Sequence, residues 1–423
     1  MNMKWMVPIA VFLLLTCRVT ADGKGVAHIP LPVDLTGALN GVEYIIRVPA
    51  NWNGTLLVFA HPNQPRGPVT AECAPVAWPP VTPSLEEQLL GLGYALAGSG
   101  FRNSDKDGIQ HTLSLTNFFK GRIGNPDRII VWGNSLGGKI ALKLIEEHPG
   151  IYDGAIANAA AVAGTPENLD SALAFGLAYA AAFGWHDDLW GPVEDLRDDV
   201  DFWADVLPLI QTEAWPGPAT YGRWEFIRLV LHQPAEAFWG TNPVNNTKFF
   251  AVNMWKATQN RAAAEAEYGG PVASNIGIQY TLSAQEELDL DSLGVNADEL
   301  LAYMNARTNI TADIAARNHA EHWGGSTGRL RRPVLTMHNI FDGQNFVSSE
   351  SYYAALVQGA GCSDQLVQAY VNGIGHGSFS ADQYLSVLGA MNSWLDTGVR
   401  PDEALLPEIK GFNLGFVPPP WLF

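Results

Sequence analysis

The sequence predicts an α/β fold, with a mostly parallel sheet covered by helices on both faces and a large, mainly helical insertion. From residue 41 to residue 160, apolar runs with strand character alternate with runs of helical spacing. That alternation is typical of β-α-β units, whose strands lie parallel in one sheet. It stops for roughly 170 residues and resumes near Pro333, and an insertion of that length forms a domain of its own.

The first half of the predicted sheet begins with two strands of different character. Residues 41–48 alternate apolar and polar side chains, which indicates a half-exposed edge strand. Residues 55–60 are continuously apolar, as in a strand buried on both faces. The patterns that follow predict a helix at 84–92, a strand at 94–98, a helix at 109–123, a strand at 128–132, a helix at 139–148 and a strand at 154–160.

The second half of the sheet follows the insertion. Its predicted elements are a strand at 333–337, a helix at 349–357, a strand at 365–371 and a helix at 381–395. The insertion contains helical stretches at 169–183, 297–304 and 310–319 and holds 8 of the 14 tryptophans. We therefore expect an α/β core formed by residues 22–160 and 333–423, and a cap formed by residues 161–332.

Residues 1–21 resemble an export signal. Lys4 precedes an apolar run from Trp5 to Leu15, and the small-residue step at 19–21 would suit cleavage. This run is too short to span a bilayer, so we expect a secreted or periplasmic protein without stable membrane insertion. A lipid anchor at Cys17 is a weaker alternative, because the residues before it fit the lipoprotein pattern poorly.

The net charge excludes some classes of binding partner, and the cysteine content bears on whether a disulfide can form. The 423 residues carry a net charge of −18, which argues against nucleic acid or an anionic membrane surface as a partner. Without Cys17, the remaining cysteines are Cys73 and Cys362, and an oxidising compartment would permit a disulfide between them. Sequence alone does not give their distance. It does not give the oligomeric state either.

The strongest local signal is Gly133-Asn134-Ser135-Leu136-Gly137, placed between an apolar strand and a helix. Glycines two residues before and after the serine allow a turn too tight for side chains, which lifts the hydroxyl above the sheet edge. The N–H of Leu136, at the helix start, would face a developing oxyanion. The alternative is a serine that only caps the helix.

A serine nucleophile needs a general base and a group that orients that base. His376 lies in a glycine-rich loop after a strand near the C-terminus, and Asp342 follows the strand at 333–337. A surface histidine and a simple Asp-Gly turn are the alternative interpretations. Asp364 is a weaker candidate for the acid because it precedes its strand.

These residues resemble the α/β-hydrolase superfamily, in which the triad follows the chain order Ser, Asp or Glu, His. The resemblance covers about residues 40–160 and 333–396 and is closest in layout to capped, esterase-like serine hydrolases. In that family the loop after the third strand donates a second oxyanion N–H. Here the loop contains His61-Pro62-Asn63, and since proline has no N–H, the resemblance assigns the donor to Asn63. His61 would either orient this loop or simply be buried.

The resemblance implies hydrolysis of carboxylic esters through an acyl-enzyme, with no cofactor. The expected partner is a small-molecule ester with an apolar or aromatic group, enclosed by cap side chains from the set Trp185, Trp190, Trp203, Trp215, Trp224, Trp239, Trp255 and Phe238. An aminopeptidase-like serine peptidase is one alternative and would need a cap carboxylate, such as Glu194 or Glu236. Lactone or polyester hydrolysis is another, and a non-catalytic binding protein a third. His319 and His322 match no metal-binding spacing, and no nucleotide-binding motif is present.

Overall fold

The computed structural model describes residues 29–64, 67–239 and 248–423. The predicted export signal and Cys17 therefore lie outside the described residues. In the described part, an eight-stranded sheet has the order β1-β2-β4-β3-β5-β6-β7-β8. The strands are β1 (Val33–Leu39), β2 (Val42–Val48), β3 (Thr55–Ala60), β4 (Ala95–Ser99), β5 (Arg128–Asn134), β6 (Gly154–Asn158), β7 (Val334–Phe341) and β8 (Leu366–Ile374). This confirms the predicted α/β class.

Strand direction divides the sheet into two parts. Neighbouring strands pair in parallel across the part of the sheet that runs β4-β3-β5-β6-β7-β8. Strand β2 is antiparallel to both β1 and β4. The predicted edge position of residues 41–48 is wrong, because β1 pairs with β2 along its whole length and forms the edge itself. The Asn40-Gly41 turn, with positive φ at both residues, makes this tight hairpin possible.

Helices cover both faces of the sheet, as the parallel pairing requires. One face packs against α2 (Asp105–Arg122), α3 (Leu136–Glu147) and α14 (Ser349–Gly359). The other packs against α1 (Leu85–Gly91) and α15 (Ala381–Thr397). The central strand β3 is buried at every position, which explains its continuously apolar sequence.

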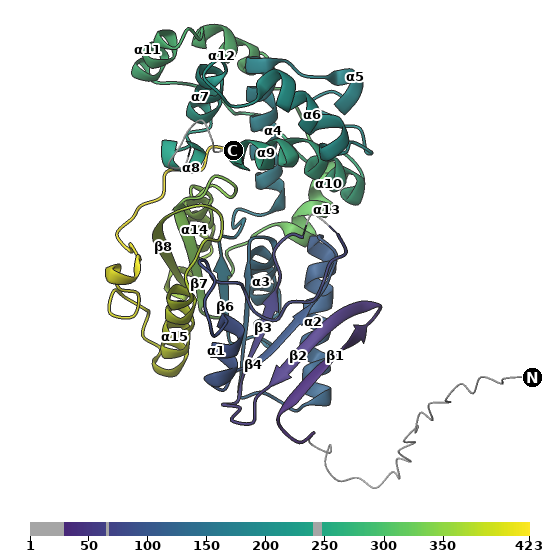
Figure 1. Cartoon of the computed structure of the whole chain (residues 1–423), viewed down its shortest axis with the longest axis vertical. Helices are drawn as coiled ribbons and strands as arrows, with labels where there is room; N and C mark the ends of the chain where they lie inside the picture. The colour runs from purple at the N-terminus through teal and green to yellow at the C-terminus, as the bar shows by residue number, and fades with distance from the viewer. Residues whose placement is uncertain (1–28, 65–66, 240–247) are drawn as a thin grey trace, which may run out of the picture.

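The segment between β6 and β7 is helical and lies at one end of the sheet (Figure 1). Its elements are α4 (Thr165–Phe183), α5 (Asp187–Trp190), η1 (Phe202–Val206), α6 (Leu207–Leu209), η2 (Ile210–Ala214), α7 (Tyr221–Val230), α8 (Ala235–Trp239), α9 (Lys248–Trp255), η3 (Lys256–Asn260), α10 (Arg261–Tyr268), α11 (Ala284–Ser292), α12 (Ala297–Asn305) and α13 (Ile314–Gly324). We refer to residues 161–332 as the cap segment. Whether it is a separate domain stays a prediction.

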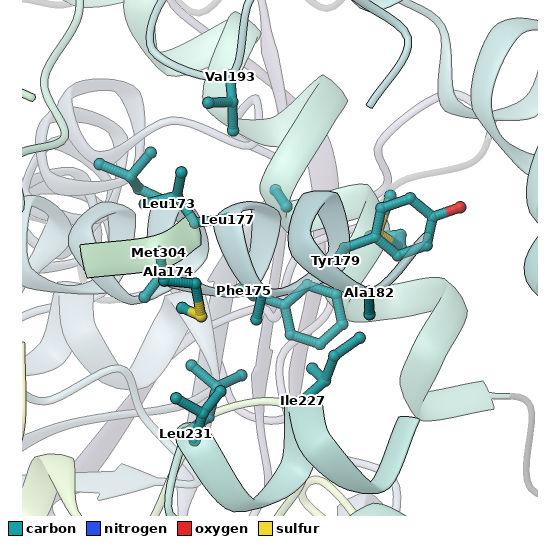
Figure 2. Close-up of a cluster of buried hydrophobic side chains, with 14 of the residues drawn as sticks. Leu173, Ala174, Phe175, Leu177, Tyr179, Ala182, Val193, Ile227, Leu231 and Met304 are labelled. Atoms are coloured by element: carbon teal, nitrogen blue, oxygen red, sulfur yellow. The ribbon is translucent and has the colours of Figure 1, made fainter. Parts of the chain in front are cut away.

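The cap segment has its own hydrophobic core around α4. Figure 2 shows α4 side chains, including Phe175 and Tyr179, beside Val193, Ile227 and Met304 from the surrounding chain. Almost every residue of α4 is buried, so this helix lacks the polar face of a surface helix. No helix in the described ranges is long and apolar enough to cross a membrane.

Candidate active site

Ser135 sits on a strained turn between β5 and α3. Its backbone has φ 55° and ψ −118°, a conformation that L-residues with side chains rarely adopt. The Ser135 N–H donates to the carbonyl of Asn158 on the neighbouring strand, at 2.8 Å. Strain at a non-glycine residue persists only where the surroundings enforce it, and such positions cluster at functional sites.

Two glycines enforce this turn by leaving no space for side chains. A Cβ on Gly137 would lie 1.9 Å from the carbonyl oxygen of Ala60, and one on Gly133 would lie 2.4 Å from the backbone of Gly137. The backbone of β3 therefore approaches the start of α3 closely. The glycine spacing recognised in the sequence reflects this contact.

His376 and Asp342 meet at the same edge of the sheet as Ser135. Asp342 directly follows β7, and His376 lies two residues after β8. His376 Nδ1 is 2.7 Å from Asp342 Oδ2. The strand register shifts between Asn339 and Phe341, just before Asp342, and such irregularities can re-aim side chains next to functional sites.

The loop after Asp342 holds this carboxylate from the other side. Asp342 Oδ1 accepts the N–H groups of Gln344, at 2.8 Å, and of Asn345, at 3.1 Å. The cap segment holds the same loop, since Asn253 Nδ2 donates to the carbonyl of Gly343 at 2.8 Å. The candidate acid thus has both oxygens engaged and little freedom to turn.

A second buried histidine supports Asp342, and sequence analysis missed it. His338 lies on β7 with its Nε2 3.5 Å from Asp342 Oδ2 and 2.8 Å from the carbonyl of Asn345. Its Nδ1 is 3.1 Å from Oε1 of buried Glu350. The available signal was a histidine inside a mostly apolar strand, four residues before Asp342.

Electrostatics keep Asp342 ionised. Burial alone would raise the pKa of Asp342, but His376 and His338 hold it well below its usual range. Burial likewise works to lower the pKa of His338, yet the hydrogen bonds to Asp342 and Glu350 raise it to about 10. His338 is therefore protonated at neutral pH, with an acceptor facing each ring nitrogen.

Ser135 and His376 line one cavity of about 230 Å³. Its other walls are Pro62, Asn63 and Gln344 from the core and Phe202, Trp203, Ala251, Val252 and Trp255 from the cap segment. We call it the aromatic cavity. In the described part of the chain no hydrogen bond joins Ser135 Oγ to His376, and such bonds are often long before substrate binds.

A second, smaller cavity of about 150 Å³ meets the first at Ser135. The two share the lining residues Asn63, Ser135, Val252, Trp255 and Gln344. The smaller one, which we call the lysine cavity, is further lined by Leu136, Lys139, Ala161, Thr165, Asn168, Leu169, Ala172, Lys256, Asn260 and Asn345. A larger hollow of about 670 Å³ lies elsewhere and has no candidate catalytic residue in its lining.

The predicted oxyanion donors both border these cavities. Leu136 is the first residue of α3, so its N–H has no acceptor within the helix. Asn63 lines both cavities, and no acceptor in the described chain takes its N–H. His61 is buried and contacts this loop: its ring stacks on Phe101 with centroids 3.9 Å apart, and its Nδ1 and Nε2 face the carbonyls of Pro62 and Phe101.

The strand order, the antiparallel strands at the N-terminal edge and the strained serine between strand and helix together decide the fold. The chain has the α/β-hydrolase fold. This confirms the resemblance stated from the sequence. In α/β-hydrolases the carboxyl edge of the sheet carries the nucleophile, and here Ser135, Asp342 and His376 are at that edge.

Comparisons with known proteins give distant matches. No protein-family model matches the chain. An o-phthalyl amidase from Xanthobacter agilis is 22% identical over 426 residues, covering 88% of this chain and 89% of the amidase. Feruloyl esterase B from Aspergillus oryzae overlays with a TM-score of 0.39 and 14% identity, over 87% of this chain and 80% of the esterase. An acylaminoacyl peptidase from Pyrococcus horikoshii overlays with a TM-score of 0.40 and 11% identity, over 89% of this chain and 44% of the peptidase.

Several residues singled out in the sequence lie away from the candidate active site. Glu194 and Glu236 are exposed and line neither cavity, and Asp364 is exposed in a short 3-10 helix, η4 (Ser363–Gln365), at the opposite end of β8. His319 and His322 are exposed on α13. Cys73 and Cys362 are both free, so the disulfide that the sequence permitted does not form.

The tryptophans of the cap segment divide into two groups. Trp203 and Trp255 line the aromatic cavity. Trp190, Trp224 and Trp239 are buried with Phe238 in the cap's own core, Trp185 packs against that core, and Trp215 is 38% exposed. The aromatic wall expected from the sequence therefore consists of two of the seven tryptophans, with Phe202 beside them.

Proposed function

We propose that the chain is a serine hydrolase that cleaves a carboxylic ester through an acyl-enzyme on Ser135. One observation carries this proposal: a serine on a strained strand-to-helix turn shares a cavity with His376, whose other ring nitrogen is 2.7 Å from Asp342. This combination of nucleophile, base and orienting acid is what acyl transfer requires. It needs no cofactor.

In the proposed reaction, Ser135 Oγ forms a bond to the substrate carbonyl carbon while its proton passes to His376 Nε2. The carbonyl π electrons move to the oxygen, and the N–H groups of Leu136 and Asn63 stabilise the resulting oxyanion. Collapse of this intermediate breaks the bond to the leaving group, which takes the proton from His376. Water then gives a proton to His376 and attacks the acyl-enzyme; collapse releases the acid and returns that proton to Ser135 Oγ.

Amide hydrolysis is the second candidate function, and two observations favour it. The sequence relative that spans most of the chain is an amidase. Asn63 Oδ1 is a buried acceptor at the cavities with no donor in the described residues, and an amide N–H would supply one. An ester has no such donor.

An aminopeptidase-like activity is less well supported. A substrate ammonium group would need a carboxylate partner, and the described lining of both cavities contains none. The two cavities total a few hundred cubic ångströms and are lined in part by the cap segment, which suits a small molecule better than a polymer.

The experiment is a matched panel of 4-nitrophenyl esters and 4-nitroanilides with the same acyl groups, tested on the wild type and on Ser135→Ala. We expect kcat to fall by at least about 10⁴-fold in the variant, because the nucleophile is lost while the fold is kept. Which series the wild type turns over decides between ester and amide. Activity that survives in Ser135→Ala would contradict the proposal.

A further inference from the structure

The lysine cavity contains an ammonium group that forms no direct ion pair with a carboxylate of the described residues. Lys256 is the first residue of η3, a π-helical turn of the cap segment. Its Nζ donates to the backbone carbonyl of Gln344 and to Asn345 Oδ1, the latter at 3.0 Å. Both acceptors are neutral. An ammonium has three N–H donors, so one remains for a group inside the cavity.

The neighbouring lysine provides a contrast. Lys139 also lines the cavity, but its Nζ is 2.6 Å from the buried carboxylate of Asp105. No carboxylate of the described chain forms an ion pair with Lys256, and none lines either cavity. Among the described lining residues, Lys256 is therefore a lysine of the lysine cavity that forms no direct ion pair, and the nearby charge of Asp342 acts on it without contact.

Desolvation disfavours the charged form of Lys256. Burial lowers the pKa of Lys256 to about 8, with Lys139 acting in the same direction and Asp342 opposing it. The group is still mostly protonated at neutral pH. Lys256 is half-buried, so its ammonium group loses part of its hydration, and a bound anion would offset that loss.

The position of His376 indicates which part of a substrate occupies each cavity. The protonated histidine must reach the leaving group to give it a proton, and His376 lines the aromatic cavity but not the lysine cavity. The leaving group therefore belongs in the aromatic cavity. The acyl group, which stays on Ser135, belongs in the lysine cavity.

The size of the lysine cavity limits the acyl group. Its volume is about 150 Å³. A protein cavity of about that size accommodates a benzene ring, so a short aliphatic chain or one aromatic ring fits. Polar groups line much of the cavity, including Asn168 and Asn260 beside the two lysines.

We propose that Lys256 binds a carboxylate carried by the acyl group, so that the enzyme selects monoesters or monoamides of small dicarboxylic acids. The proposal rests on the proposed function, since it assigns the acyl side of the same site. It makes Lys256 a specificity-determining residue. The leaving group is then the apolar or aromatic part of the substrate.

The test compares two substrates that differ only in charge: the mono-4-nitrophenyl ester of glutaric acid and the analogue in which the free carboxylate is a carboxamide. The corresponding 4-nitroanilides form a second pair. We expect the wild type to prefer the acid by about 10- to 100-fold in kcat/KM, the range of a charge-assisted hydrogen bond. Lys256→Met should remove this preference, so that the ratio of acid to carboxamide kcat/KM falls to about 1, while Lys256→Arg should restore part of it.

The matched control is Lys143→Met, which removes one lysine from the chain, as Lys256→Met does. Lys143 is a buried lysine on α3 that contacts Glu147 and the carbonyl of Gly325, away from both cavities. Lys143→Met should leave the acid-to-carboxamide ratio unchanged. Equal turnover of the two substrates by the wild type, or an unchanged ratio in Lys256→Met, would overturn the proposal.

Direct binding separates this proposal from the proposed function. Glutarate, the product, should raise the melting temperature of the wild type more than glutaramide does, whether or not the protein is active. In the wild type this difference should shrink as the pH rises through about 8, where Lys256 loses its proton. If glutarate has no advantage over glutaramide, the carboxylate site is absent even if Ser135 is the nucleophile.

Discussion

Four buried or half-buried ionisable side chains form a chain of contacts beside the aromatic cavity. Glu350 contacts His338, His338 contacts Asp342, and Asp342 contacts His376. Glu350 also accepts hydrogen bonds from Thr336, at 2.8 Å, and Gln368, at 2.6 Å. Each charge in the chain has an opposite charge next to it, which is the condition under which buried charges are tolerated.

His338 gives this chain a measurable pH dependence. Its pKa is about 10 in the folded protein and about 6.5 when unfolded. The stabilisation from its charge is therefore complete below about pH 6.5 and is lost as the pH rises through about 10. We predict that His338→Gln lowers the free energy of unfolding at pH 7 by about 3 kcal/mol. It should also reduce the loss of stability that the wild type shows between pH 7 and 10.

Denaturant unfolding at several pH values checks this prediction. His322→Gln is the control, because His322 is exposed on α13 and should leave both stability and its pH dependence almost unchanged. An alkaline slope in His338→Gln equal to that of the wild type would show that His338 is not the titrating group.

Candidate residues whose chemistry has a local pattern could be predicted from the sequence, whereas those whose proposed role depends on distant contacts could not. Ser135, Asp342 and His376 each follow a strand, and their position at one sheet edge follows from parallel pairing. Lys256 acquires its role only because a cap helix lies against the loop after Asp342. No spacing rule predicts a contact across that distance in sequence.

At the scale of elements, the turn between β5 and α3 depends on glycine. We predict that Gly137→Ala destabilises the protein by more than about 2 kcal/mol, because its Cβ would meet the Ala60 carbonyl at 1.9 Å and backbone would have to move. Activity should fall with stability, since the same turn aims Ser135.

Gly389→Ala is the matched control for this prediction. Gly389 lies within α15, and a Cβ there would meet nothing within 4 Å. Alanine should therefore be neutral or stabilise the helix by about 0.5–1 kcal/mol. Thermal unfolding of both variants measures the difference, and a Gly137→Ala protein as stable as Gly389→Ala would contradict the account of the turn.

Most core elements were predicted to within a few residues, and the exceptions have physical causes. Helix α2 begins at Asp105, four residues before the predicted start, because Ser104 caps it through the N–H of Asp107 and its first turn is polar. Strand β1 was missed because most of its positions are exposed and its sequence alternates weakly. Its stability comes from pairing with β2, which periodicity does not reveal.

At the scale of the whole molecule, the length of the interruption predicted the cap segment, but not how it packs. Its helix α4 is buried nearly all round, so it has no amphipathic pattern from which to infer a docking face. Polar contacts connect the cap segment to the core. Asp105 on α2 accepts hydrogen bonds from Thr165 on α4, at 2.5 Å, and from Tyr268 on α10, at 3.0 Å. These contacts help to position the cap segment over the site.

The most direct test of the central claim is covalent trapping of the nucleophile. We would incubate the protein with a fluorophosphonate that carries a small alkyl group and map the modified peptide by mass spectrometry. The account predicts one adduct on Ser135, which is lost in Ser135→Ala and forms much more slowly in His376→Ala, because the histidine activates the hydroxyl. An adduct on another residue, or none on the folded protein, would contradict it.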